Sequence, residues 1–345
     1  MTRPAALGEP SGRVAAPDAD TSGVSAEPGR PAGRTHPAGP SRVRPWRARL
    51  HRLDVKGSPY AYVAPFFVLF AVFGGFPLVY TAWMSLHDWN LLDTEHPFVG
   101  AANYGRLFGD PYFWNALVNT ASIWVLSTVP QLLLALLLAH LLNTRLRART
   151  FFRAGMLLPN VTSVVAVAVI FTQLFGRDYG MINWMLGGLG AGHIDWQAGR
   201  ASSHIAIAVM VIWRWTGYNA LIYLAAMQAI PKELYESATL DGASTMQQLR
   251  QITVPMIRPT IIFTVIVSTI GGLQLFAEPL LFDTAPGSTS GGASRQFQTL
   301  TLFLYEQGFR LYEFGYAAAS AWVMFLIILV VSAVNFLVVR RIRST

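Results

Sequence analysis

The stretch IPKELYESATLDGASTMQQLRQITVPMIRP, from Ile230 to Pro259, separates two long apolar runs and decides how the chain is organised. Its local signals predict two short helices joined by a turn. Asp241–Gly242 breaks the first helix, because glycine adopts turn conformations that other residues avoid. Ser244 and Gln247 have the spacing of a capping box, which predicts the start of a second helix that Pro255 ends. On periodicity alone, a solvated loop with an ordinary amphipathic helix explains this segment equally well.

The whole chain is too apolar for an average soluble protein. Of its 345 residues, 53% are hydrophobic and 13% are charged, and the mean hydropathy is +0.40. Average soluble domains carry about 25% charged residues. We therefore expect much of the chain to lie in lipid. The absence of cysteine excludes disulfide scaffolds, thiolate metal sites and cysteine nucleophiles.

Six stretches are apolar and long enough to cross a membrane. A hydrocarbon core about 30 Å thick needs roughly 20 apolar residues of helix. The sequence therefore predicts an all-α integral membrane protein with six transmembrane helices, at approximately Tyr60–Leu86, Leu117–Leu142, Phe151–Phe175, His204–Ala229, Thr260–Phe282 and Gly315–Val339. Proline and glycine inside these stretches are compatible with membrane helices, because neighbouring helices satisfy the freed backbone groups.

Basic residues predict the orientation of the chain. If the N-terminus is inside, the inner segments 42–56, 145–153, 232–258 and 340–343 together carry 16 Lys and Arg, whereas the outer loops carry five. Cytoplasmic segments are the ones enriched in Lys and Arg. We therefore expect a multi-pass protein of the cytoplasmic membrane with both termini in the cytoplasm. The net charge of +8 is explained by this topology and does not indicate nucleic-acid binding.

Composition also divides the chain into three parts. Residues 1–41 hold seven Pro and six Gly with no hydrophobic period, which predicts a disordered N-terminal tail. Residues 42–57 form a basic juxtamembrane segment. Residues 58–341 form the six-helix domain, which includes the loop at 230–259.

The loop carries a family motif. Seven of its residues match the EAA motif of binding-protein-dependent ABC transporter permeases, namely Glu236, Ala238, Asp241, Gly242, Ala243, Ile252 and Pro255. Ser237, Leu249 and Val254 depart from the motif by mild changes in size. The segments Tyr60–Asn90, Phe98–Thr120 and Arg177–Leu186 also resemble sugar permeases of the maltose, glycerol-3-phosphate and multiple-sugar class. The resemblance covers about residues 58–341 and is to the type of the first permease subunit.

This resemblance implies a type I ABC importer permease that translocates a carbohydrate or related polyol by alternating access. The loop is then a coupling helix that docks on an ATP-hydrolysing subunit. The implied partners are a second permease subunit in a heterodimer, two ATP-binding cassette subunits, and an extracytoplasmic solute-binding protein.

The chain itself lacks the motifs of an enzyme. A P-loop needs a lysine after glycine, and the two lysines, Lys56 and Lys232, follow Val55 and Pro231. There is also no G-x-S-x-G and no H-E-x-x-H motif, and no catalytic or metal site is predicted. ATP and Mg²⁺ are therefore expected on a partner subunit, with no cofactor bound by this chain.

Polar residues inside the fourth and fifth predicted spans are candidates for the substrate path. Charged groups at membrane depth are rare and usually functional. The candidate set is Arg214, Trp215, Tyr218, Asn219, Gln274 and Glu278, with Gly271, Gln274 and Glu278 expected on one face of a continuous helix. Aromatic rings with amide and charged groups suit the hydroxyls and C–H faces of sugars.

Two alternatives stay open for these residues. Arg214 and Glu278 can pair simply to stabilise the helix bundle. Glu278 can instead be the coupling acid of an ion-coupled secondary transporter. An intramembrane enzyme is the more distant alternative, because no nucleophile–base pair is visible in the sequence.

Overall fold

The computed structural model describes residues 45–143, 149–284 and 288–341. The tail predicted at 1–41 lies outside the described residues, as do residues 42–44 of the basic segment. Within the described ranges the chain is helical, and its β-type pairings are the isolated bridges His87–Phe98 and Asn90–Glu313. The chain divides into two units, Met1–Pro65 and Phe66–Thr345.

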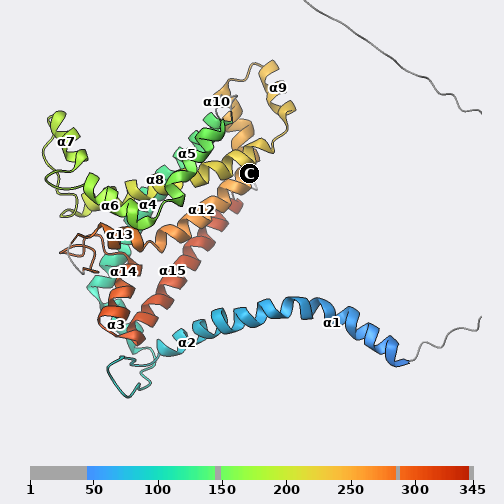
Figure 1. Cartoon of the computed structure of the whole chain (residues 1–345), viewed down its shortest axis with the longest axis vertical. Helices are drawn as coiled ribbons and strands as arrows, with labels where there is room; N and C mark the ends of the chain where they lie inside the picture. Colours follow the sequence, from blue (N-terminus) through green and yellow to red (C-terminus); the bar gives the residue numbers. More distant parts are fainter. Residues whose placement is uncertain (1–44, 144–148, 285–287, 342–345) are drawn as a thin grey trace, which may run out of the picture. The chain divides into compact units, whose positions relative to one another are not determined.

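The helices keep the order of the chain in Figure 1. They are α1 (Pro45–Phe70), a π-helical turn (Ala71–Gly75), α2 (Phe76–Met84), α3 (Ala102–Gly109), α4 (Pro111–Leu142), α5 (Arg149–Val161), α6 (Val164–Leu174), α7 (Met181–Gly188), α8 (Arg200–Gln228), α9 (Lys232–Leu240), α10 (Thr245–Gln248), a second π-helical turn (Leu249–Thr253), α11 (Val254–Met256), α12 (Arg258–Leu273), α13 (Ala277–Phe282), α14 (Leu300–Tyr305), a third π-helical turn (Glu306–Arg310) and α15 (Phe314–Arg341).

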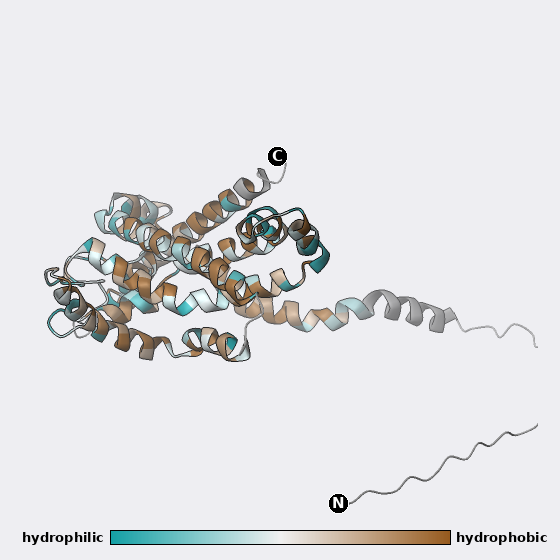
Figure 2. Cartoon of the chain, turned by 90° about the horizontal axis from the view of Figure 1, so that it is seen from above, coloured by the Kyte–Doolittle hydropathy of each residue, from teal (hydrophilic) through white to brown (hydrophobic). Residues whose placement is uncertain are grey.

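Four segments are helical, apolar and long enough to span a membrane. They are Ser58–Met84, Pro111–Leu142, Arg200–Gln228 and Phe314–Leu337. Two further pairs of helices meet the same criterion if each bent pair counts as one span, which gives up to six spans among the described residues. Hydrophobic residues run along the long helices and hydrophilic residues gather in loops and at helix ends (Figure 2).

The predicted third span, Phe151–Phe175, consists of two helices that meet at a bend. α5 and α6 are bent by 90° at the break between Val161 and Val164. Ser163 leaves the helical region, with φ −53° and ψ 131°, and the Thr162 hydroxyl bonds back to the Leu158 carbonyl oxygen at 2.7 Å. The helix therefore stops at this point, where Pro159, Asn160, Thr162 and Ser163 interrupt the hydrophobic run.

The predicted fifth span, Thr260–Phe282, is also not one helix. α12 ends at Leu273 and α13 begins at Ala277. A second bend of 72° precedes α12, between Met256 and Arg258. α12 is therefore flanked by a helix break on each side, and the hydropathy of the sequence does not reveal either break.

α8 is the central helix of the second unit. It packs along α4 and also contacts α5, α6, α12 and α13. Gly217 makes the contact with α5 close, because a β-carbon at this position would overlap the carbonyl oxygen of Met156. The buried side chains of α8, such as Met210 and Tyr223, belong to two hydrophobic clusters along its length. α9 and α10 lie near one end of α8, and α13 lies near the other (Figure 1).

The end of the bundle that carries α13 is stabilised by polar contacts. The loop before α14 is buried from Gln296 to Thr299. Arg295 pairs with Glu306 at 2.5 Å, and its carbonyl oxygen accepts a hydrogen bond from Asn119 at 2.9 Å. This loop is therefore a fixed part of the bundle, and one of its residues reaches the candidate site described next.

Candidate functional site

A cavity of about 340 Å³ opens between α4, α8, α12 and α13. Its lining consists of Thr128, Gln131, Val211, Arg214, Trp215, Tyr218, Asn219, Val267, Ser268, Gly271, Gly272, Gln274, Leu275, Phe276, Ala277 and Glu278. The structure thus brings all six predicted substrate residues together around one space. Mostly apolar pockets with a few convergent polar groups are the usual form of small-molecule sites.

An ion pair lies in the wall of this cavity. Arg214 Nη1 donates to Glu278 Oε1 at 2.9 Å, and the two side chains are 19% and 6% exposed. Arg214 Nε is buried and has no hydrogen-bond partner among the residues that the structure describes. Arg214 lies halfway along α8, where an unpaired charge in lipid costs roughly 2.5–3.5 kcal/mol on insertion scales. The pair therefore lowers the cost of holding both charges at this depth and at the same time faces the cavity.

Aromatic rings form another part of the wall. The Trp215 and Tyr218 rings meet edge to face with centroids 6.0 Å apart, and the Arg214 guanidinium carbon lies 5.6 Å from the Trp215 ring centroid. Trp213 is outside the cavity lining and contacts Phe171, with ring centroids 5.5 Å apart. The two neighbouring tryptophans therefore have different surroundings, which their spacing on the helix predicts.

Gln274 and Glu278 reach the cavity through a helix break. The expectation that Gly271, Gln274 and Glu278 share one face of a continuous helix is wrong, because α12 ends at Leu273 and α13 starts at Ala277. The Thr299 hydroxyl donates to the Leu275 carbonyl oxygen at 2.8 Å and satisfies backbone that the break leaves free. The side chains still converge on the cavity because the broken segment itself lines it.

Three polar lining residues were missed by the analysis of the sequence: Thr128 and Gln131 on α4, and Ser268 on α12. Thr128 and Gln131 are buried polar side chains of α4, which also buries Asn119, Thr120 and Ser127. A polar residue in the middle of a hydrophobic span was the available signal. Only the packing of α4 against α8 reveals that it faces the same space as Arg214.

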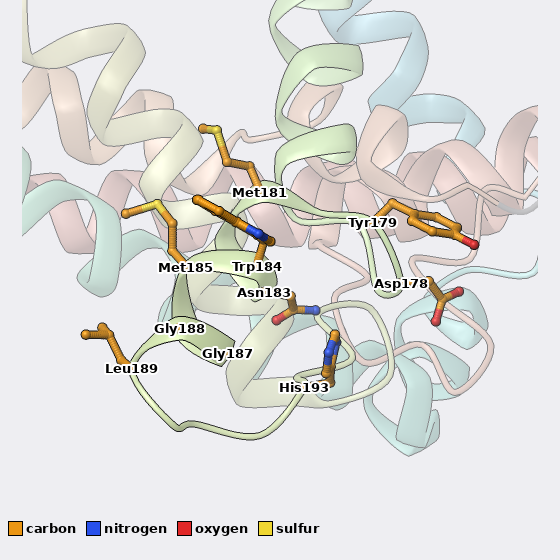
Figure 3. Close-up of a pocket in the computed structure, with 10 residues that line it drawn as sticks. All are labelled: Asp178, Tyr179, Met181, Asn183, Trp184, Met185, Gly187, Gly188, Leu189 and His193. Carbon is orange, nitrogen blue, oxygen red and sulfur yellow. The ribbon is translucent and has the colours of Figure 1, made fainter.

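A larger cavity of about 810 Å³ lies around α7 and is drawn in Figure 3. None of the predicted site residues lines it. Asn183 is buried there, and its side-chain amide group donates to the carbonyl oxygens of Arg177 and Ile194, each at 2.8 Å. Trp184, which is 77% exposed, and Met185 point away from this anchor. We regard this cavity as the surface of an anchored loop and not as the candidate site.

The loop at 230–259 has the predicted turn and cap. α9 ends at Leu240, and Gly242 has a φ of +79°, which glycine adopts without strain. The Ser244 and Gln247 side chains form both hydrogen bonds of the predicted capping box. The predicted role of Pro255 is wrong, because the helical path continues through the π-helical turn Leu249–Thr253 and α11 to Met256.

The motif residues of this loop are accessible. Glu236, Asp241, Gly242 and Pro255 are exposed, and Ala238, Ala243 and Ile252 are partly buried.

Other residues of the loop hold its two arms together. The Tyr235 and Thr253 hydroxyls lie 2.9 Å apart, and Gln248 Nε2 donates to the Ala243 carbonyl oxygen at 3.1 Å. Leu249 is buried. The loop is therefore a fixed projection that presents most of its motif to solvent.

The described residues contain no group of three or more His, Cys, Asp or Glu side chains placed to hold a metal ion.

Comparison with known families gives one match over most of the chain. Residues 113–344 match the family described as binding-protein-dependent transport system inner membrane component. The lactose transport system permease protein LacF of Rhizobium radiobacter is 36% identical over 292 residues, which are 84% of this chain and 95% of LacF. The arabinooligosaccharides transport system permease protein AraP of Bacillus subtilis is 34% identical over 309 residues, 88% of this chain and 95% of AraP.

A solved structure shares the fold. A chain in the crystal structure of a bacterial ABC transporter that imports the acidic polysaccharide alginate is 24% identical, with a TM-score of 0.72. The match covers 87% of the chain described here and 99% of that chain. At this identity the likeness supports the architecture and leaves the ligand to be argued from the cavity.

Proposed function

The chain belongs to the family of binding-protein-dependent transport system inner membrane components and has the type I ABC importer permease fold, and we propose that it carries a carbohydrate or related polyol across the cytoplasmic membrane through the cavity at Arg214 and Glu278. The observation that carries this proposal is the convergence of the six predicted residues on one cavity inside the bundle.

The chemistry of the cavity suits a sugar. Hydroxyl groups need hydrogen-bond donors and acceptors, and the amides of Gln131, Asn219 and Gln274 supply both. The Trp215 and Tyr218 rings offer apolar faces for the C–H groups of a sugar ring. The names of the relatives, which refer to lactose and to arabinooligosaccharides, support the same class of ligand.

The energy for transport comes from other subunits in this proposal. The exposed loop of α9 and α10 docks on one of two ATP-binding cassette subunits, which bind ATP and Mg²⁺. Nucleotide-driven closure then moves α8 and α12, because the loop joins these two helices along the chain. A second permease subunit completes the pathway, and an extracytoplasmic solute-binding protein delivers the sugar.

No comparison supports the alternative of an ion-coupled carrier that uses Glu278. The ion pair is a further argument against this role, because the Glu278 carboxylate is already paired with Arg214 at 2.9 Å. We therefore retain only the ATP-driven importer.

The orientation of the chain follows from its basic residues. Both termini are cytoplasmic in this proposal, and the loop of α9 and α10 lies on the same side. Reporter fusions after Asp93, Asp195 and Gly291 should report an outside location, and a fusion after Gly242 an inside location. An outside signal after Gly242 would remove the loop from any contact with an ATPase and contradict the proposal.

The cavity is tested by Gln274→Ala and Tyr218→Ala. Loss of one good hydrogen bond costs about 1–3 kcal/mol, so the apparent affinity for the sugar should fall roughly 5- to 150-fold. Uptake and basal ATPase activity would be measured in proteoliposomes that contain the assembled complex. The basal ATPase activity should stay at the wild-type rate.

Matched controls are Gln251→Ala in the cytoplasmic loop and Tyr62→Ala on α1, both at exposed positions. They should leave uptake unchanged. Wild-type uptake kinetics in both cavity variants would place the substrate site elsewhere.

A further inference from the structure

We infer that the cavity selects uncharged sugars over acidic ones, and that Glu278 determines this specificity by neutralising Arg214. The inference rests on the proposed function and adds the charge of the substrate. The relatives leave this property open, because LacF is named for a neutral sugar and the structural neighbour imports an acidic polysaccharide.

The first step is the charge of the lining. Arg214 and Glu278 are the charged residues among those that surround the cavity. Because Arg214 Nη1 and Glu278 Oε1 are 2.9 Å apart, their charges offset each other within the wall. A ligand in this cavity therefore meets dipoles and hydrogen-bonding groups with no net charge.

The second step is that the pair is buried. Glu278 is 6% exposed, and Arg214 lies midway along a 29-residue helix. Neither group can exchange its partner for bulk water without a rearrangement of the bundle. Charge screening by salt is also weak at such a site. The neutrality of the cavity is therefore a property of the folded bundle.

The third step concerns an acidic ligand. A carboxylate close enough to bond with Arg214 also lies within about 4–6 Å of the Glu278 carboxylate, a range at which like charges repel strongly. The acidic sugar therefore approaches the guanidinium against the repulsion of the Glu278 carboxylate, even where it bonds to a donor other than Nη1. A hydroxyl has no such conflict, since it can accept from Arg214 and donate to Glu278.

The fourth step is the set of uncommitted neutral groups. Gln131, Tyr218, Ser268 and Gln274 line the cavity, and their side chains make no hydrogen bond to any residue that the structure describes. These amides and hydroxyls can both donate hydrogen bonds to the hydroxyls of an uncharged sugar and accept hydrogen bonds from them. The cavity thus offers four neutral hydrogen-bonding side chains to a ligand, whereas its two charged side chains already pair with each other.

The test measures binding to the assembled transport complex in nanodiscs, without the solute-binding protein, so that only the permease cavity selects. Saturation-transfer difference NMR suits weak sugar binding. The neutral probes are lactose, maltose, trehalose and cellobiose, and the acidic probe is digalacturonate. The variants are Glu278→Gln, Arg214→Gln and the double change, each checked for assembly by size-exclusion chromatography. Glu313→Gln is the matched control, because it removes an acid paired with Arg106 outside the cavity.

The wild-type complex should bind at least one neutral disaccharide at least tenfold more tightly than digalacturonate. Glu278→Gln frees Arg214 and should strengthen digalacturonate binding at least tenfold. Arg214→Gln should still bind digalacturonate more weakly than the neutral disaccharide. The double variant, which leaves two neutral amides in place of the charged pair, should lose the discrimination, and Glu313→Gln should match the wild type.

Three results overturn the inference. One is equal or tighter binding of digalacturonate by the wild type. Another is a ratio of neutral-disaccharide affinity to digalacturonate affinity that stays at the wild-type value in both Glu278→Gln and the double variant. The third is the absence of a signal from all four neutral probes. Gln274→Ala separates these results from a failure of the proposed function. Suppose that Gln274→Ala weakens the binding of the neutral sugars, while the ratio of neutral to digalacturonate affinity is the same with and without Glu278. Only the charge inference then fails. If Gln274→Ala leaves neutral binding unchanged, the cavity itself is not the sugar site.

Discussion

The chain contains two helix breaks that serve its two candidate sites, and they are built differently. The break at Asp241–Gly242 lies in the exposed loop, where Gly242 has a φ of +79° and a capping box starts the next helix. The break at 274–276 lies inside the bundle and is held by the hydrogen bond from the Thr299 hydroxyl to the Leu275 carbonyl oxygen. The first break is specified locally, whereas the second depends on a segment 24 residues away along the chain.

This difference has a functional consequence. A locally specified turn keeps its shape when its surroundings change, which suits a projection that docks on another subunit. A break held by a tertiary contact depends on the packing around it, which suits a cavity whose shape changes during transport.

Damage to the exposed break should abolish transport while the complex still assembles. Gly242→Pro forces a φ near −65° where the chain has +79°, and it removes the amide hydrogen bond to the Thr239 carbonyl oxygen. Asp241→Lys reverses an exposed charge at the same turn. We expect uptake and binding-protein-stimulated ATPase activity to fall to background in proteoliposomes. Val165→Ala, at an exposed position of α6 outside the loop, is the control and should behave as the wild type. Normal coupling in both turn variants would exclude the loop from the ATP signal.

Removal of the contact that holds the interior break should have a smaller effect. Thr299→Val keeps the shape of the side chain and leaves the Leu275 carbonyl oxygen without its donor, and it also removes the weaker cap of α14, in which the same hydroxyl accepts from the Leu302 amide at 3.4 Å. An unsatisfied buried acceptor costs about 1–3 kcal/mol. We expect a lower unfolding temperature of the purified complex and weaker sugar binding, with stimulated ATPase activity retained.

Thr301→Val is the matched control for this change, because the Thr301 hydroxyl makes only a 3.7 Å contact with the Met324 sulfur atom. If both variants unfold at the same temperature as the wild type, the interior break does not depend on Thr299.

The contrast between the two breaks also explains how much the sequence could predict. Gly242, Ser244 and Gln247 act within a few residues of the turn that they form, so the loop was predictable apart from the role of Pro255. Residues 274–276 themselves carry no Pro or Gly, and the nearby Gly271, Gly272 and Pro279 are compatible with an unbroken membrane helix, so the sequence did not locate the interior break. The bend between α5 and α6 does have a local signal, because Pro159, Asn160, Thr162 and Ser163 interrupt the hydrophobic run there, but hydropathy averaged over a span does not register it.

The cavity was only partly predictable. Arg214 and Glu278 stand out because charges are rare inside apolar spans, and they fall on the same cavity. Thr128, Gln131 and Ser268 carry no comparable signal and enter the site only through the packing of α4 and α12. The chemistry of the pocket is thus visible in sequence, whereas its full lining requires the fold.

The central claim is that the exposed loop controls access to the buried cavity, and a single cysteine tests it most directly. The chain has no cysteine, and Ser268 lines the cavity on α12, so Ser268→Cys provides one thiol at the site. With cysteine-free partner subunits, its reaction with a membrane-impermeant thiosulfonate reagent would be measured from each side of the membrane, with and without ATP and the binding protein. The accessible side should change when ATP and the binding protein are added, and Asp241→Lys should abolish that change. Labelling from the same side in both states, or a change that persists in the Asp241→Lys background, would contradict the account.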